Sequence, residues 1–327
     1  MTIDISKYFL TFANMNDEKY MRRCLQLAAN GIQGARPNPM VGAVIVAPSL
    51  MERAGDEAII GEGYHVRCGE GHAEVNAFAS VKDESLLKDA TIYVSLEPCA
   101  HYGKTPPCAD LIIKKGVKRV VVGCIDPFAE VKGRGIEKIR KAGIEVEVGV
   151  LEKECQWLNR RFFTYHSKHR PYIILKWAQT ANGFIDDHFK QLMISNEQIQ
   201  MLSHQLRAEE DAILVGHTTF DRDHPSLNVR HWHGPDPKRI VLTHDRPLPQ
   251  LMDDLYQHGI QSLIVEGGCQ THESFIQAGL WDEIRMEVSP ITVSDGTRAP
   301  QLPSDIRFLS KKEYGENTMT VFSKKSQ

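Results

Sequence analysis

Short apolar runs alternate with amphipathic stretches along the first half of the chain. The runs have the length and β-branched composition of buried strands and lie at residues 41–46, 90–96 and 118–124. The stretches around them repeat apolar residues three or four positions apart and predict helices at 17–31, 73–81 and 108–116, with a helix, turn and strand at 133–149. Gly31 and Gly116 follow periodic segments, where glycine commonly ends a helix. Alternating strands and helices indicate an α/β layered domain that ends near Val150.

A second series of strand-like runs follows a helical stretch at residues 151–167. The runs lie at residues 170–178, 211–216, 238–243, 261–268 and 282–290, with helical segments such as 196–210 between them. We therefore predict an N-terminal tail at 1–15, a first domain at 16–150, a linker helix at 151–170 and a second α/β domain at 171–327. Met15 is a second candidate start.

The composition excludes several classes of protein but does not indicate a particular function. The 327 residues are 42% hydrophobic and 25% charged, which is typical of globular domains and excludes a disordered chain. The formal net charge of -3 predicts no general attraction to nucleic acid or anionic membranes. No apolar run is long enough to span a bilayer, and the N-terminus has no signal-peptide pattern. An odd number of cysteines, 7, predicts reduced thiols and a cytoplasmic location.

One histidine and two cysteines have the spacing of a zinc site. His72, Cys99 and Cys108 supply one imidazole and two thiolates, and a catalytic zinc keeps three protein ligands and one open position. Glu74 follows His72 by two positions and can carry a proton between water and a departing amine. His-x-Glu with a later Pro-Cys is the pattern of zinc nucleobase deaminases.

Two other interpretations of this pattern remain open. A structural zinc would need a fourth ligand, for which Cys68 and His101 are the nearest candidates. A nucleic-acid deaminase should carry a basic groove, and the acidic net charge speaks against it.

The segment between the two cysteines is long. Residues 100–107 separate them, where nucleoside and editing deaminases usually have two residues. This loop offers His101, Lys104 and Thr105 beside the metal, and Lys104 could hold a phosphate as a point charge. The alternative is a solvated surface turn.

Six segments between Asp17 and about Gly149 together resemble the deaminase half of the bifunctional deaminase-reductase family of riboflavin biosynthesis. The Gly-Lys-Thr-Pro-Pro stretch in the cysteine gap is the most specific, because it separates this family from cytidine and tRNA deaminases. The segments are PNPMVGAVIV, GEGYH, GEGHAEVNA, YVSLEPCAHYGKTPPCADLI, DPF…VKGRGI and AGIEVEVGVLEKE.

The resemblance implies a fold and a first activity. The expected fold class is α/β, with an N-terminal cytidine-deaminase-like three-layer α/β/α domain followed by a dihydrofolate-reductase-like α/β domain. The expected reaction is the zinc-dependent hydrolytic deamination of diaminohydroxyphosphoribosylaminopyrimidine, with Glu74 relaying the proton. The residues implied to line the pocket for this phosphoribosyl-pyrimidine are Asn38, His65, His101 and Lys104.

The same family carries a reductase domain that uses NADPH to convert the ribose to a ribitol chain. The residues implied to contact substrate are Lys176, Arg207, Leu227, Arg230 and Glu266. Those implied to contact the cofactor are Ala178, Thr219, Asp223, Gly267 and Gly268. The N–H groups of the two glycines could hold a cofactor phosphate, although a plain tight turn would explain them equally well. The resemblance also suggests a homo-oligomer.

Three departures from the family concern the second domain. Residues 180–183 read Thr-Ala-Asn-Gly in place of Ser-Leu-Asp-Gly, and residues 193–195 read Met-Ile-Ser in place of Trp-Ile-Thr. Only residues 244–260 lie between two strands that the family separates by a further strand. We expect this loss to damage both the sheet and the cofactor groove. The alternative function is then a deaminase alone, with a degenerate reductase domain that serves dimerisation or support.

Overall fold

The computed structural model describes residues 5–47, 59–102, 106–128 and 132–325, with side chains from residue 16 onward. The chain divides into two compact units, Met1–Ser167 and Lys168–Gln327. None of the helices in these ranges is long and apolar enough to cross a membrane. All 7 cysteines are free thiols, as the sequence predicts.

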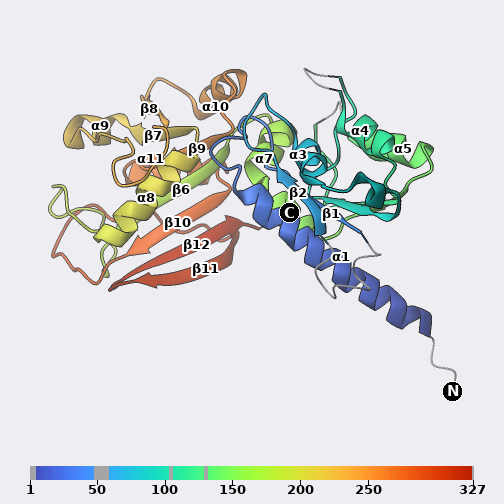
Figure 1. Ribbon diagram of the computed structural model, residues 1–327. Helices are drawn as coiled ribbons and strands as arrows, with labels where there is room; N and C mark the ends of the chain where they lie inside the picture. The colour runs from blue at the N-terminus through green and yellow to red at the C-terminus, as the bar shows by residue number, and fades with distance from the viewer. Residues whose placement is uncertain (1–4, 48–58, 103–105, 129–131, 326–327) are drawn as a thin grey trace. The chain divides into compact units, whose positions relative to one another are not determined.

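The first unit is built on a five-stranded sheet in the order β2-β1-β3-β4-β5 (Figure 1). Strand β1 runs antiparallel to both β2 and β3, whereas β3, β4 and β5 are parallel. The strands are β1 (Gly42–Val46), β2 (Ile59–Tyr64), β3 (Thr91–Val94), β4 (Arg119–Val122) and β5 (Glu145–Val148). All of these except β2 lie where the apolar runs predict strands.

Helices cover both faces of this sheet, which gives the expected three layers. Along β1, Ala43 and Ile45 pack into the cluster with α3, α4 and α5, while Val44 and Val46 pack with α1 and α6. This alternation is the two-residue period of a strand that is buried on both faces. The helices are α1 (Ile5–Ala29), α3 (Ala73–Ser80), α4 (Cys108–Lys115), α5 (Arg134–Lys141) and α6 (Glu152–Leu158), with a 3-10 turn η1 (Glu84–Asp89) before β3.

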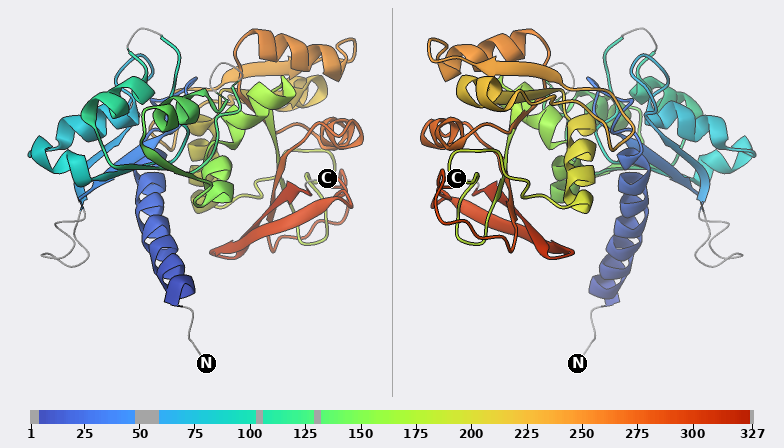
Figure 2. Two further views of the ribbon diagram at one scale, coloured as in Figure 1. Left: turned by 90° about the vertical axis from the view of Figure 1, so that its right-hand side faces the viewer. Right: turned by 90° about the vertical axis from the view of Figure 1, so that its left-hand side faces the viewer.

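Two sequence-based boundaries differ from the structure. Helix α1 begins at Ile5 and is continuous through most of the expected tail (Figure 2). The expected linker helix is two helices, α6 and α7 (Arg160–Lys168), and nearly all of it belongs to the first unit. The break falls at Asn159, whose buried amide accepts from the backbone N–H of Met40 at 2.8 Å and donates to its carbonyl at 2.8 Å.

The strand directions bring three helix starts to one edge of the sheet. Strands β2, β3 and β4 point the same way, because both β2 and β3 are antiparallel to β1 and β4 is parallel to β3. Each is followed along the chain by a helix, α3, α4 and α5 respectively. The N-termini of these helices therefore lie together at the side of the sheet formed by the carboxyl ends of the three strands.

Strand β2 escapes prediction because two of its residues are glycines that the packing requires. Helix α3 lies directly against this strand, and a Cβ atom on Gly63 would come within 2.3 Å of the backbone nitrogen of Ala77. Gly61 is similarly close, 2.6 Å, to the carbonyl oxygen of Ala77. Glycines in a short run weaken a strand signal, although here they mark close approach of a helix.

The second unit holds a seven-stranded sheet in the order β11-β12-β10-β6-β9-β7-β8. The five strands from β10 to β8 are parallel, and β12 and β11 add an antiparallel hairpin at the other edge (Figure 1 and Figure 2). The strands are β6 (Tyr172–Gln179), β7 (Ala212–Gly216), β8 (Lys238–Leu242), β9 (Ser262–Val265), β10 (Glu283–Val288), β11 (Ile306–Tyr314) and β12 (Asn317–Lys324).

The short segment at residues 244–260 does not damage this sheet, so that expectation was wrong. Strand β8 is the edge strand, and helix α10 carries the chain from it back to β9, which pairs with both β6 and β7. The further strand that the family has after β8 would therefore extend the sheet beyond its outermost strand, and its loss leaves the central strands paired. The helices of this unit are α8 (Glu197–Glu209), α9 (His217–Asp223), α10 (Leu248–Gln257) and α11 (Cys269–Gln277).

We expect Gly63→Ala to lower the unfolding free energy of the first unit by about 2 kcal/mol, because a methyl group there must push α3 away from β2. Calorimetry of the full chain, which separates the transitions of the two units, would measure this loss. The control is Glu62→Ala on the same strand, which removes only a partly exposed pair with Arg23 and should cost about 1 kcal/mol or less. Equal losses in the two variants would contradict the close packing.

Candidate functional site

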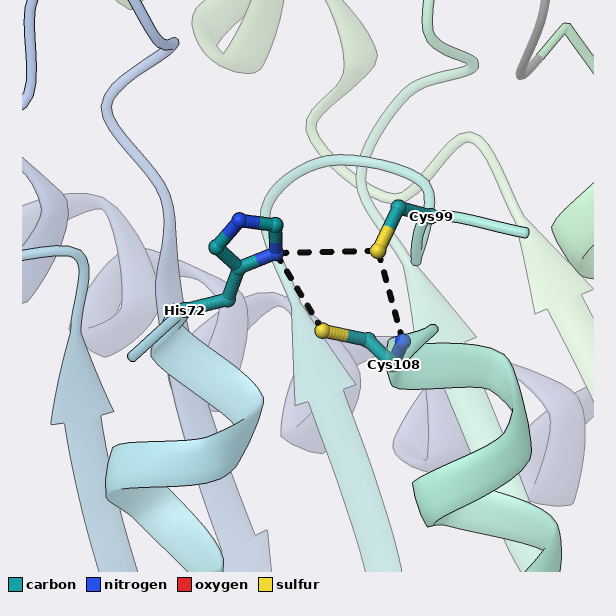
Figure 3. A group of neighbouring side chains, drawn as sticks. All are labelled: His72, Cys99 and Cys108. Carbon is teal, nitrogen blue, oxygen red and sulfur yellow. Dashed lines mark hydrogen bonds between the residues drawn. The ribbon is translucent and has the colours of Figure 1, made fainter. Parts of the chain in front are cut away.

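The three predicted zinc ligands converge at the edge where the helices of the first unit begin. His72 precedes α3, Cys108 is the first residue of α4, and Cys99 lies in the loop that follows β3. The His72 Nδ1 atom lies 3.6 Å from Cys99 Sγ and 3.4 Å from Cys108 Sγ, and the side chains point toward one another (Figure 3). The three ligand atoms all lie within 4.8 Å of one another.

This geometry fits a tetrahedral zinc. Zinc bonds of ordinary length to an imidazole and a thiolate place the nitrogen and sulfur about 3.6 Å apart. Both observed separations are close to that value. Among the residues that the structure describes, the group of side chains close enough to share a metal ion is His72, Cys99 and Cys108, and it does not include Cys68 or His101. A closed structural site formed with either residue is therefore not supported.

Local hydrogen bonds favour thiolate at this cluster. The Cys108 thiol, the His72 ring and the backbone N–H of Cys108, which donates at 3.3 Å, lower the pKa of Cys99 to about 4. The hydrogen bond to Cys99 and burial raise the pKa of Cys108. The hydrogen bond to Cys99 also raises the pKa of His72. A metal that binds here needs both cysteines as thiolates, and the hydrogen bonds to Cys99 already favour that form of it.

Glu74 lies beside the ligands in the first turn of α3. Its side chain is only 3% exposed and interacts with the Cys108 side chain. Burial raises the pKa of Glu74 to about 7, and the neighbouring Cys99 charge contributes in the same direction. A carboxyl group that titrates near neutral pH can both accept and release a proton, as a proton shuttle must.

A residue that the sequence analysis missed, Glu97, fixes the loop that carries Cys99. Glu97 is 4% exposed, and its carboxylate accepts hydrogen bonds from backbone N–H groups in the loop after β4 and at the start of α5. The donors and distances are Asp126 at 3.3 Å, Gly133 at 2.9 Å, Gly135 at 3.0 Å and Ile136 at 3.4 Å. The only signal in the sequence is an acid next to the Pro-Cys pair and a glycine-rich stretch further on.

Two of the residues predicted to line the deaminase pocket lie together. Asn38 Nδ2 is 3.2 Å from His65 Nε2, and His65 Nδ1 is 3.1 Å from the carbonyl of Gly71. Burial lowers the pKa of His65, so a neutral ring with its proton on Nδ1 satisfies both contacts. The His65 ring also lies edge-on to the His72 ring, with centroids 5.2 Å apart. His101 is exposed, with its ring 6.4 Å from that of Phe128, and Lys104 lies outside the described residues.

In the second unit, three of the predicted substrate residues form a buried ion network. Glu266 lies 2.7 Å from Arg207 and 3.8 Å from Lys176. Lys176 and Arg207 lower the pKa of Glu266 against the effect of its burial, so the carboxylate stays charged. Glu266 Oε1 and Arg207 Nε are buried and have no hydrogen-bond partner, which leaves one acceptor and one donor for a ligand.

This network lines a cavity of about 360 Å³. The predicted residues Arg230, Ala178, Thr219, Asp223, Gly267 and Gly268 also line it. Leu227 does not: it is 4% exposed and packs in a core cluster with Leu206 and Ile213. The N–H of Gly268 already donates to Thr219 Oγ1 at 3.1 Å, and Asp223 is paired with Arg222 at 2.8 Å.

Further polar residues at this cavity were not predicted from the sequence. His204 lines it, and its Nδ1 atom accepts from the backbone N–H of Arg230 at 3.0 Å. Burial and the neighbouring Arg207 lower the pKa of His204 to about 4, so it is a neutral acceptor at physiological pH. Ser195, one of the departures from the family, also lines the cavity and donates to the buried carboxylate of Glu287 at 2.5 Å. Asn182, another departure, accepts from Thr180 and donates to the carbonyl of Val293.

Fold and site together define a two-domain enzyme, in which a zinc-dependent deaminase unit precedes a reductase unit. Residues 14–124 match the family model of the cytidine and deoxycytidylate deaminase zinc-binding region. Residues 171–320 match the model of the RibD C-terminal domain.

Comparison with known proteins identifies the family. The chain is 37% identical to the riboflavin biosynthesis protein RibD of Aquifex aeolicus, over 86% of this chain and 88% of that protein. It is 34% identical to RibD of Bacillus amyloliquefaciens, over 91% of this chain and 90% of that protein. The chain belongs to the RibD family of bifunctional deaminase-reductases of riboflavin biosynthesis, whose cofactors are Zn²⁺ and NADPH. This confirms the resemblance seen in the sequence.

Solved structures agree over nearly the whole chain. The diaminohydroxyphosphoribosylaminopyrimidine deaminase/5-amino-6-(5-phosphoribosylamino)uracil reductase of Thermotoga maritima superposes with a TM-score of 0.86 at 30% identity, over 95% of this chain and 99% of that one. A RibD of Acinetobacter baumannii superposes with a TM-score of 0.84 at 30% identity, over 96% of this chain and 100% of that one. The expected α/β fold of both domains is thereby confirmed.

We expect Glu97→Gln to weaken zinc retention by about tenfold or more, because the amide places an N–H group against backbone donors and releases the Cys99 loop. Competition with a colorimetric chelator would measure this change. The control is Glu137→Gln. Glu137 is an exposed carboxylate on α5, the helix whose first N–H groups bind Glu97, and this variant should retain zinc as the wild type does. Unchanged retention in Glu97→Gln would show that the four hydrogen bonds do not position Cys99.

Proposed function

We propose that the first unit hydrolytically deaminates diaminohydroxyphosphoribosylaminopyrimidine and that the second unit reduces the ribose of the deaminated product to a ribitol chain with NADPH. The Thermotoga maritima protein, which is similar over nearly the whole chain, carries both of these activities in its name. The observation that carries the proposal is the convergence of His72, Cys99 and Cys108 with a buried Glu74 beside them.

In this proposal, His72, Cys99 and Cys108 hold the zinc and Glu74 moves the proton. Zinc with an open position lowers the pKa of a water molecule bound there. Glu74 accepts a proton from the attacking water and delivers it to the departing amino group, which leaves as ammonia. Burial of Glu74 raises its pKa, which favours uptake of a proton from the attacking water.

Asn38 and His65 are the proposed contacts for the pyrimidine edge. Asn38 uses its amide N–H toward His65 Nε2, which leaves its carbonyl oxygen as an acceptor for a ring amino or N–H group. The neutral His65 in turn fixes the orientation of that amide. His101 and Lys104, in the loop between the two cysteines, are the proposed contacts for the ribose phosphate.

The charges of the second unit suit a phosphorylated substrate. Arg222 on the lining of the smaller cavity pairs with both Asp186 and Asp223. The remaining charged residues of the lining are Glu266 and three cations, Lys176, Arg207 and Arg230, so cations exceed carboxylates by one over the whole lining. The unpartnered Glu266 Oε1 is available to a sugar hydroxyl, and Arg207 Nε to an oxygen atom. Ala178, Thr219, Asp223, Gly267 and Gly268 keep the cofactor roles that the resemblance implies as part of this proposal, whereas Leu227, which lies in the core cluster, is left out of it.

The alternative of a degenerate reductase domain has little support. Its sheet is continuous, its cavity carries the expected charges, and the RibD C-terminal model matches residues 171–320. The residues at two of the departures, Asn182 and Ser195, each form hydrogen bonds to neighbouring segments. A cytoplasmic location and a homo-oligomeric state are included in the proposal as expectations from the family.

We expect Glu74→Gln to retain one zinc ion and to lower the rate of ammonia release by about 10²- to 10⁴-fold, since the amide cannot relay a proton. Elemental analysis and a coupled ammonia assay would measure both quantities. The control is Glu62→Gln, a partly exposed acid on β2. Near wild-type ammonia release from zinc-loaded Glu74→Gln would rule out the proposed shuttle.

We expect removal of zinc by a chelator to abolish ammonia release and to leave NADPH oxidation intact when the deaminated substrate is supplied, because the metal ligands all belong to the first unit. Absorbance at 340 nm follows the second reaction, and re-addition of Zn²⁺ should restore the first. Loss of NADPH oxidation in the chelated protein would contradict the assignment of the two activities to separate units.

A further inference from the structure

An aromatic side chain of the second unit lies unusually open to solvent. Phe189 is 62% exposed and lines a cavity of about 640 Å³. Within the described part of the chain, no aromatic ring or cation packs on it. Ligand sites commonly present aromatic side chains in this way, since a ring that is half uncovered can be covered by a planar ligand.

The backbone that presents Phe189 is strained. Asp187 and Lys190 pair across a tight turn, with N–H to carbonyl distances of 3.1 Å and 2.8 Å. The two residues at its tip, His188 and Phe189, both have left-handed backbones, with φ of 49° and 62°. Turns of this kind favour Asn-Gly, because a side chain such as phenylalanine is disfavoured at positive φ.

Neighbouring residues hold the turn in this conformation. The carboxylate of Asp186 is 1% exposed and accepts from the N–H of Phe189 at 3.3 Å and from the N–H of Thr297 at 2.7 Å. The N–H of His188 donates to the carbonyl of Asp295 at 3.0 Å. Strain of this kind persists only where the surroundings determine the backbone, and it is concentrated at ligand sites.

The position of the cavity indicates which part of the cofactor it receives. It shares Asp186, Thr219, Arg222 and Gly268 with the smaller cavity that Lys176 and Glu266 line, so the two cavities adjoin each other. The sugar to be reduced lies by Lys176 and Glu266 in the proposed function. The nicotinamide must reach that sugar, so the adenosine half of NADPH extends into the larger cavity.

We propose that Phe189 covers the adenine ring of NADPH and contributes to the affinity for the adenosine half. The inference rests on the proposed reductase function of this unit. Phe189 binds the ring by stacking, and Arg222 and Arg246 on the same cavity supply positive charge for the phosphates. The bound ring covers the exposed face of Phe189.

The test uses 2′,5′-ADP, which contains the adenosine half alone, and the full chain. We expect Phe189→Gly to weaken its binding by about tenfold in isothermal titration calorimetry, because one stacking surface is lost. The same change should raise Tm by about 2 °C, because glycine adopts the left-handed backbone without strain. Phe189→Trp should keep the wild-type affinity, since another aromatic ring restores the surface.

The control is Phe308→Ala, which removes a similarly exposed phenylalanine from β11, outside the lining of both cavities, and should bind 2′,5′-ADP as the wild type does. Equal affinity of Phe189→Gly and the wild type, or no binding by the wild type, would overturn the proposal. A lower Tm with unchanged affinity would show that Phe189 only packs the turn. Binding of 2′,5′-ADP without NADPH oxidation would instead contradict the proposed function alone.

Discussion

The deaminase site depends on one constraint, the arrival of three helix N-termini at a single edge of the first sheet. Free N–H groups at the start of a helix stabilise negative charge. Cys108 begins α4, Glu74 lies in the first turn of α3, and Glu97 accepts the N–H groups around the start of α5. The same backbone feature therefore serves a metal ligand, a proton carrier and the anchor of the Cys99 loop. The direction of β2, β3 and β4 imposes it.

The second unit builds its site on the same principle with a different balance of charge. Lys176 lies near the end of β6, Glu266 directly follows β9, and α9 begins where β7 ends. Ligands of parallel sheets bind outside the carboxyl ends of the strands, and this is where both cavities lie. The first site gathers anionic ligands for a cation, whereas the second places Lys176 and Arg207 beside the buried carboxylate of Glu266.

The sequence predicted what depends on local pattern. Apolar runs predicted most strands of both sheets, and the chemistry of His72, Cys99 and Cys108 was sufficient to predict their convergence. Contacts between distant segments were missed. The sequence of β2 contains glycines that its helix requires, β11 carries charged residues on exposed positions, and the apolar residues of β12 are interrupted by polar ones. The role of Glu97 depends on N–H groups that lie 29 to 39 positions further along the chain. The expected damage from the short segment at 244–260 was wrong because sequence order does not reveal that β8 is an edge strand.

The proposed deamination depends on a zinc ion with three protein ligands and one exchangeable position beside Glu74. X-ray absorption at the zinc edge of the purified, zinc-loaded protein measures this coordination directly. We expect two sulfur atoms at about 2.3 Å and two lighter atoms at about 2.0 Å, one of them from an imidazole and the other exchangeable. A shell of three sulfur atoms, or of two sulfur atoms and two imidazoles, would contradict the account, because a fourth protein ligand would close the position that the reaction needs.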